Sequence, residues 1–185
     1  MRSLLSRKHQ IPSAAFQKGF DAYERGDYAT ALHEFRPLAE QENAGAQNDL
    51  GVLYEKGQGV SQNDKTAVKL YRFAAEQGFA IDQYNLGLMY HKGQGVPQNY
   101  KTAVKWYKLA AEQGVARAQT SLGVMYGKGR GVSKNDKTAV KWYRFAAEQG
   151  FAIAQYNLGL MYHKGQGVPQ DYVRAHMWYN LATSQ

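Results

Sequence analysis

The chain has 185 residues but no cysteine, only four prolines and no long apolar run. Without cysteine there is neither a disulfide nor a thiolate-based zinc site, and the redox compartment stays undetermined. No apolar run approaches the roughly 20 residues that a membrane-spanning helix needs. The first residues, MRSLLSRKHQIPSAAF, also lack the apolar segment of about 7–15 residues that marks a secretory signal.

Apolar residues make up 44% of the chain, which is enough for a packed core and argues against wholesale disorder. Glycine (19) and tyrosine (14) are abundant, a mix that suits tightly packed helices joined by glycine-bearing turns. The formal net charge of +8 is compatible with a nucleic-acid or anionic-membrane partner, or simply with a solvated helix face. Where the charged residues lie within the sequence distinguishes between these alternatives.

An internal repeat of 36 residues organises most of the sequence. The blocks are 44–79, 80–115, 116–151 and the shorter 152–185. Each contains a Leu-Gly pair, a tyrosine three residues after that glycine, and the motif KG-x-GV. The motif AAEQG occurs three times.

A shorter unit at 13–43 precedes these blocks, and Ala22–Gln41 matches them with part of the loop missing. We expect it to be an atypical terminal repeat, after a leader-like or tag-like segment at 1–12. Residues 59–98 and 131–170 differ only at Gln62/Lys134, Leu70/Trp142 and Asp82/Ala154, which indicates duplication of a two-repeat cassette.

Each unit is predicted to form two helices. Apolar residues recur at helical spacing in both halves of a unit, and Asn, Asp or Ser at the start of the second half are good N-caps. Gly78, Gly114 and Gly150 are predicted to end the second helices. One such pair cannot bury its apolar face alone, so the pairs must stack into an all-α array.

The motifs LG-x-x-Y, G-x-GV, A-x-x-x-Y and AA-x-QG, with the A-x-A-Q opening of Ala44–Gln47, recur in order over nearly the whole chain. In this they resemble the Sel-one-like repeat family, which is related to the tetratricopeptide solenoids. The resemblance implies a right-handed alpha-alpha superhelix, a solenoid of about five stacked helix-turn-helix repeats. It also implies an adaptor in protein complexes, often in bacterial envelope, secretion or signalling roles. Asp82, where alanine is usual, and the shortened first unit depart from the family pattern.

No motif in the sequence indicates the cellular compartment of the protein. Since the printed sequence has no intact signal peptide, we expect a cytoplasmic protein, or a bacterial periplasmic or secreted one if a leader was removed.

Three chemical interpretations do not fit the sequence. The glycines of GKGRGV (127–132) follow a helix and recur in every unit, unlike a dinucleotide fingerprint, so we interpret them as a turn. His91 and His163 are two repeats apart, roughly 20 Å at a helix-layer spacing of about 10 Å, which is too far to share a metal. The motifs Ser-x-x-Lys, Ser-Asp-Asn and Lys-Thr-Gly are absent, and we expect no catalytic residue, metal or cofactor.

The lysines of the second helices, such as Lys101, Lys105, Lys137 and Lys141, are interpreted as a solvated face, because the resemblance places these helices on the outer side. A nucleic-acid patch is the alternative, although the aromatic residues are expected to be used in packing.

In tetratricopeptide-like arrays the first helices line a concave groove, and one stripe of each faces it. We predict that these stripes bind a protein or peptide partner. Their residues are Asn48 and Glu55; Ile81, Tyr84, Leu88 and His91; Arg117 and Thr120; and Ile153, Tyr156, Leu160 and His163. The alternative is that the four aliphatic residues among them pack repeat against repeat.

The sequence therefore predicts a non-catalytic interaction scaffold. A cell-wall or β-lactam hydrolase-like enzyme and a basic nucleic-acid-binding module are the alternatives. Trp178 and Leu181 are expected at an open stacking edge of the last helix, so that either the natural chain continues or this end pairs with another molecule.

Overall fold

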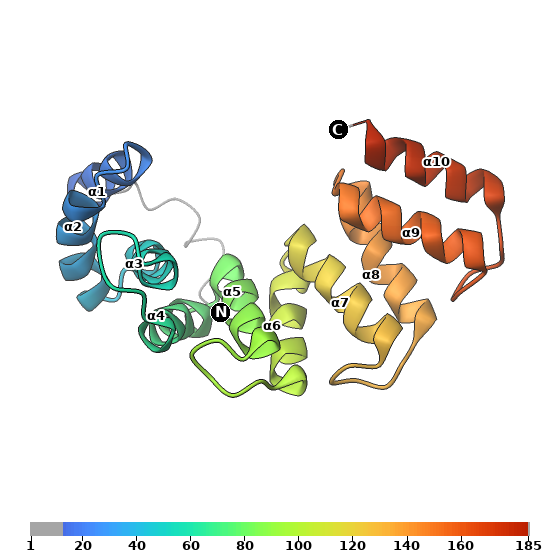
Figure 1. Ribbon diagram of the computed structural model, residues 1–185, viewed down its shortest axis with the longest axis horizontal. Coiled ribbons are helices and arrows are strands. Elements are labelled where there is room, and N and C mark those ends of the chain that lie inside the picture. The colour runs from blue at the N-terminus through green and yellow to red at the C-terminus, as the bar shows by residue number, and fades with distance from the viewer. Residues whose placement is uncertain (1–12, 185) are drawn as a thin grey trace, which may run out of the picture. The chain divides into compact units, whose positions relative to one another are not determined.

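The computed structural model describes residues 13–184, which form ten α-helices and no β-strand, arranged as consecutive helix–turn–helix pairs (Figure 1). The predicted all-α repeat class is confirmed. None of the helices in this range combines the length and the apolarity needed to cross a membrane. The described residues divide into two compact units, the first ending at Ala74 and the second beginning at Ala75.

In each pair we call the earlier helix the first helix and the later one the second helix. The first unit contains α1 (Ala14–Glu24), α2 (Tyr28–Glu40), α3 (Ala44–Lys56) and most of α4 (Asp64–Glu76). The second contains α5 (Ala80–Lys92), α6 (Tyr100–Glu112), α7 (Ala116–Lys128), α8 (Asp136–Glu148), α9 (Ala152–Lys164) and α10 (Tyr172–Thr183).

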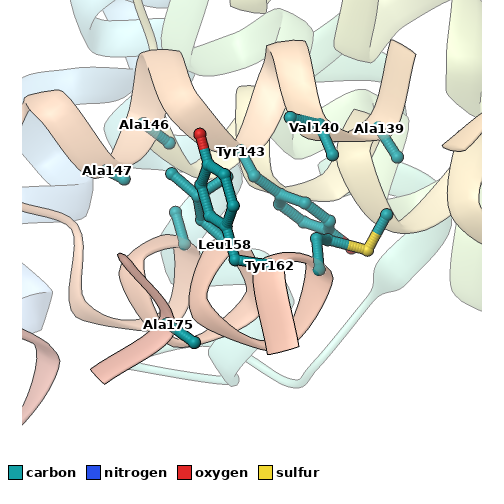
Figure 2. Packing of buried hydrophobic residues seen from close by; sticks show 10 residues of the cluster. Ala139, Val140, Tyr143, Ala146, Ala147, Leu158, Tyr162 and Ala175 are labelled. Atoms are coloured by element: carbon teal, nitrogen blue, oxygen red, sulfur yellow. The ribbon is translucent and has the colours of Figure 1, made fainter. Parts of the chain in front are cut away.

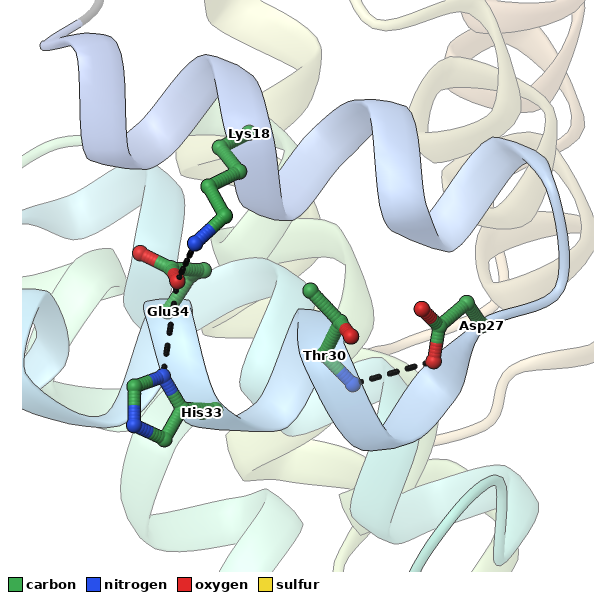
Figure 3. A network of polar contacts seen from close by, with 5 residues as sticks. All are labelled: Lys18, Asp27, Thr30, His33 and Glu34. Carbon is green, nitrogen blue, oxygen red and sulfur yellow. Dashed lines mark hydrogen bonds and ion pairs between the residues drawn. The ribbon is translucent and has the colours of Figure 1, made fainter.

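The first unit has a small core of alanine, leucine and one fully buried phenylalanine, Phe35. Polar contacts fasten the α1–α2 pair at its surface (Figure 3). The Lys18 ammonium lies 2.6 Å from the Glu34 carboxylate, linking the two helices. Asp27 caps α2 by accepting a hydrogen bond from the Thr30 amide. Both contacts lower the pKa of the carboxyl group involved.

The core of the second unit repeats one pattern, in which a tyrosine of each second helix packs among alanines and leucines. Figure 2 shows this around Tyr143, with Val140 and Ala147 beside it on α8 and Leu158 and Tyr162 opposite on α9. The alanines allow the helix backbones to approach closely, so the large rings fill the remaining space.

The second helices begin where their caps predict. Asn63, Asn99, Asn135 and Asp171 each accept a hydrogen bond from the backbone amide three residues later. This bond satisfies one of the amides that a helix start leaves free.

A glutamine recurs at the same position of α3, α5, α7 and α9 and bonds to the second helix before it. Each donates its side-chain amide, at 3.1–3.2 Å, to the carbonyl of an alanine near the end of the preceding second helix; the pairs are Gln47–Ala39, Gln83–Ala75, Gln119–Ala111 and Gln155–Ala147. These glutamines are buried, and each adds a second donor to a carbonyl that also accepts the backbone amide three residues later.

Candidate interaction surface on the first helices

In the second unit, the candidate positions at the start of the first helices are surface residues. The exposed fractions of Ile81 and Ile153 are 55% and 61%, and Arg117 at the same repeat position is also exposed. The two isoleucines therefore do not fill the core between repeats. An exposed apolar residue at the same place in two repeats is a feature of interaction surfaces.

The two tyrosines of the stripe have the same neighbours but different exposure. Tyr84 packs on Tyr107 with ring centroids 5.8 Å apart, and Tyr156 packs on Tyr179 at 5.4 Å. Tyr156 is 54% exposed, whereas Tyr84 is half-buried. Burial raises the pKa of Tyr84, and Arg117 and Ser121 of α7 partly offset the effect.

Leu88 and Leu160 are half-buried, and the histidines that follow them are aromatic packing residues. His91 lies edge-on to Tyr100 with ring centroids 5.3 Å apart, and His163 meets Tyr172 in the same way at 5.3 Å. Burial, followed by Arg130, Lys92 and Lys128, lowers the pKa of His91. These surroundings therefore disfavour the protonated form of His91.

Thr120 corrects one prediction about the stripe. It is only 7% exposed, and its hydroxyl donates to the carbonyl of Ala116 at 2.9 Å. Because a threonine within a helix can bond back to the preceding turn, its hydroxyl is already used and is not available to a partner.

A depression of about 250 Å³ lies in the second unit. Its lining comes from α5, α7 and the start of α9: Tyr84, Arg117, Thr120, Ser121, Phe151 and Ile153. Ser121 contacts the hydroxyls of both Tyr84 and Tyr107. Sequence reasoning missed Ser121 and Phe151. The signal for Ser121 was present, because the equivalent positions in the duplicated repeats are Asn85 and Asn157.

Charge is distributed unevenly between the two units. Residues 75–185 contain 13 lysines and arginines and 6 acidic residues, a net charge of +7, whereas residues 13–74 have 7 and 9, a net charge of −2. The positive charge of the chain thus lies mainly in the unit that contains the depression. The lysines of its second helices, including Lys101, Lys105, Lys137 and Lys141, are exposed as predicted.

In the first unit the candidate residues Asn48 and Glu55 are half-buried. The Glu55 carboxylate accepts a hydrogen bond of 2.6 Å from the Tyr71 hydroxyl of the same pair. Glu55 therefore links α3 to α4, and this hydrogen bond explains the presence of a carboxylate here without a partner protein.

The glycine loops pack on protein backbone. Gly129 and Gly131 have φ of 66° and 71°, a conformation that glycine adopts without strain. A Cβ at Gly131 would lie 2.5 Å from the carbonyl of Tyr100, at the start of the preceding second helix. The loop is thus a close contact between repeats, which explains why the motif recurs.

The remaining histidines are outside the stripe. His33 is beside Glu34 at 3.4 Å and His176 is beside Asn180 at 3.1 Å, while His9 lies outside the described residues. Within residues 13–184 no group of three His, Asp or Glu side chains is placed to hold a metal ion.

The last helix has a different outer stripe from the helices before it. Val173, Met177 and Leu181 are 81%, 45% and 42% exposed. The first two stand where α6 and α8 carry lysine pairs, and Leu181 matches the exposed Leu109 and Phe145.

The expected stacking edge of α10 therefore needs correction. Leu181 lies on the outer stripe and Trp178 is half-buried against the core. The positions equivalent to the buried Val140 and Ala147 are the exposed His176 and Thr183.

Comparison with known proteins agrees with the repeat pattern. The family model described as Sel1 repeat matches residues 44–79, 80–115, 116–151 and 152–185. A Sel1 repeat protein from Oxalobacter formigenes is 42% identical, with a TM-score of 0.87, over 92% of this chain and 68% of that chain. A protective antigen of uropathogenic Escherichia coli strains with an SLR fold is 36% identical, with a TM-score of 0.88, over 92% of this chain and 38% of that chain.

Among curated proteins, an exopolysaccharide production negative regulator of Rhizobium meliloti is 36% identical over 63 residues. The match covers 34% of this chain and 24% of that protein, so the chain spans about a quarter of its curated relative.

Proposed function

Because the chain belongs to the Sel1 repeat family, whose members are generally protein–protein interaction modules, we propose that it is a non-catalytic adaptor that holds an extended segment of a partner protein. The segment lies on the first-helix face, which we define as the exposed and half-exposed residues Ile81, Tyr84, Arg117, Ile153 and Tyr156 of α5, α7 and α9.

The observation that carries this proposal is the exposure of two isoleucines at the same position of two repeats, at 55% and 61%. Each has a tyrosine one turn further along its helix. Tyrosine supplies a large, rigid contact area at a small entropic cost, which is why interaction surfaces are rich in it. The framework residues around them are buried, so the face varies while the scaffold stays constant.

The test is selection of random displayed peptides on the purified protein. We expect selected peptides to bind the double variant Ile81→Ser, Ile153→Ser at least about tenfold more weakly, since removing anchor residues has effects of this size. The matched control is Leu109→Ser, Phe145→Ser, which removes two exposed apolar residues from second helices. Failure to select any peptide, or equal losses in both double variants, would overturn the proposal.

A second surface supports self-association through α10. In the second unit, the outer lysines of α6 and α8 would repel those of another copy, and α10 has Val173 and Met177 in place of two such lysines. An antiparallel pair of α10 helices would place Val173 of one copy near Leu181 of the other, as a two-fold axis requires. Sedimentation at several concentrations should show association that Val173→Lys, Met177→Lys abolishes and Leu109→Lys retains. A wild-type protein that stays monomeric throughout contradicts this assignment.

A further inference from the structure

We propose that the depression around Arg117 selects the partner by binding an Asp or Glu side chain of the bound segment, with a large aliphatic residue next to it in the partner's sequence. This inference rests on the proposed function, because it names the kind of partner residue that the first-helix face binds. The occupant is an internal acidic residue of an extended protein segment.

The charges of the unit favour a carboxylate at this position. Arg117 is exposed, and its guanidinium forms no ion pair with any residue from 13 to 184. Neither α7 nor α9 contains an acidic residue, and the one acid of α5, Asp82, is only 2% exposed. The face is therefore cationic without a compensating exposed carboxylate on its helices. A basic segment would be repelled there, and an acidic one attracted.

The shape and chemistry of the depression match such a residue. Arginine presents its N–H donors in a planar fork that fits the two oxygens of a carboxylate. The lining combines the hydroxyl-bearing Tyr84 and Ser121 with the apolar Phe151 and Ile153. An acidic side chain on Arg117 places the next apolar side chain of the segment against Ile153.

Repeat symmetry identifies Arg117 as the distinctive residue of the face. Its position is occupied by Ile81 in the preceding repeat and Ile153 in the following one. At this position the three consecutive first helices α5, α7 and α9 therefore carry an apolar, a cationic and an apolar residue. A segment that crosses it in extended form has apolar residues on both sides of its acid. For this reason we assign the carboxylate to a side chain within the segment and not to a chain end.

The experiment is peptide selection in two libraries, one with random residues flanked by fixed sequence and one with a free carboxyl end. Each is selected on the wild-type protein, on Arg117→Gln, on Arg117→Glu and on the matched control Lys101→Gln, an exposed charge of a second helix. We expect the flanked library to yield Asp or Glu between apolar residues on the wild type and the control. This acidic preference should disappear with Arg117→Gln and turn to Lys or Arg with Arg117→Glu.

A selected peptide is then synthesised with its acid and with Glu→Gln and Glu→Lys changes. Loss of one charged partner should weaken binding about tenfold or more, because hydrogen bonds between charged groups are the strong ones. The Glu→Lys peptide should bind Arg117→Glu better than it binds the wild type.

The outcomes separate this inference from the function on which it rests. If no peptide is selected, the proposed function fails and this inference fails with it. If peptides are selected without an acid, or if Arg117→Gln binds them as well as the wild type does, only this inference fails. Selection of acids solely from the library with the free carboxyl end also overturns it, since the ligand would then be a chain terminus.

Discussion

The ring of Tyr107 occupies the space that a side chain at Gly87 would need: a Cβ at Gly87 would lie 2.7 Å from Cδ1 of that ring. The same relationship joins Gly51 to Tyr71, and Gly159 to Tyr179 at 2.8 Å. In the four full repeats, the Leu-Gly pair of the first helix and the tyrosine of the second helix are therefore one packing unit. This contact explains why both recur at a fixed spacing.

Gly87→Ala should destabilise the protein although alanine is the better helix former. Alanine in a helix interior gains about 0.5–1 kcal/mol over glycine, but the added methyl overlaps a fully buried ring. Overpacking of this kind costs typically about 1–3 kcal/mol, so we expect a net loss of about 1–2 kcal/mol in urea unfolding.

Gly127→Ala is the matched control, because a Cβ at Gly127 meets only the Ala139 methyl, at 3.7 Å. Here the helix preference acts alone, and stability should rise by up to about 1 kcal/mol. Equal effects of the two substitutions would contradict the packing argument.

Gln119→Leu should cost about 1–3 kcal/mol in the same assay. The substitution removes the buried bond that Gln119 donates to the Ala111 carbonyl, which keeps its backbone bond from Gly114, and it also removes the oxygen that accepts from the Gln149 amide at 2.7 Å. Gln98→Ala removes a similar bond, to the His91 carbonyl at 2.8 Å, but at an exposed site where water can replace it. Its effect should stay within about 0.5 kcal/mol. A loss with Gln98→Ala as large as that with Gln119→Leu would argue against the buried link.

Asp49→Asn should stabilise the protein at neutral pH and not at acid pH. Burial raises the pKa of Asp49 from 3.8 to about 6, so above pH 6 the folded state bears the cost of a buried charge. Below the unfolded pKa of 3.8 both states are protonated and this cost is absent. The stability of the wild type due to this group therefore falls as pH rises from about 4 through about 6.

The gain from Asp49→Asn should reach about 1–3 kcal/mol at pH 8 and vanish near pH 3, measured as the difference between the two unfolding curves. Asparagine already stands at the equivalent positions 85 and 157, so the substitution fits the repeat. A gain that does not depend on pH would show that the asparagine acts through packing or a new hydrogen bond.

The sequence predicts the repeat architecture well because the signals that create it are local and recur. Asn135 caps α8, and Gly129 ends α7 in the left-handed region; both effects depend on a few neighbouring residues. The spacing of the stripe also places Ile81 and Ile153 on one exposed position. These features follow from helical periodicity, and the same pattern recurs in every repeat.

How far each stripe side chain is buried cannot be predicted from helical periodicity. Thr120 lies on the stripe but turns its hydroxyl to its own helix, and Ser121, one position off the stripe, reaches the depression. Whether a side chain is covered depends on the next pair of helices, which periodicity within one helix does not describe. The binding role of the stripe therefore stays a prediction, and Ser121 in the lining of the depression was not predicted from the sequence.

The duplicated tyrosines test this dependence on the next pair directly. Tyr84 and Tyr156 have identical neighbours for many residues in sequence, and each packs on a tyrosine of the following helix. Tyr84 is half-buried beside Arg117 and Ser121, whereas Tyr156 is 54% exposed. We expect Tyr84→Ala to lower the free energy of unfolding by about 2–3 kcal/mol and Tyr156→Ala by less than about 1 kcal/mol. Tyr84→Phe, which keeps the ring and removes only the hydroxyl that contacts Ser121, should cost about 1 kcal/mol. If Tyr84→Ala and Tyr156→Ala cost the same, the cover that α7 gives to Tyr84 contributes nothing to stability.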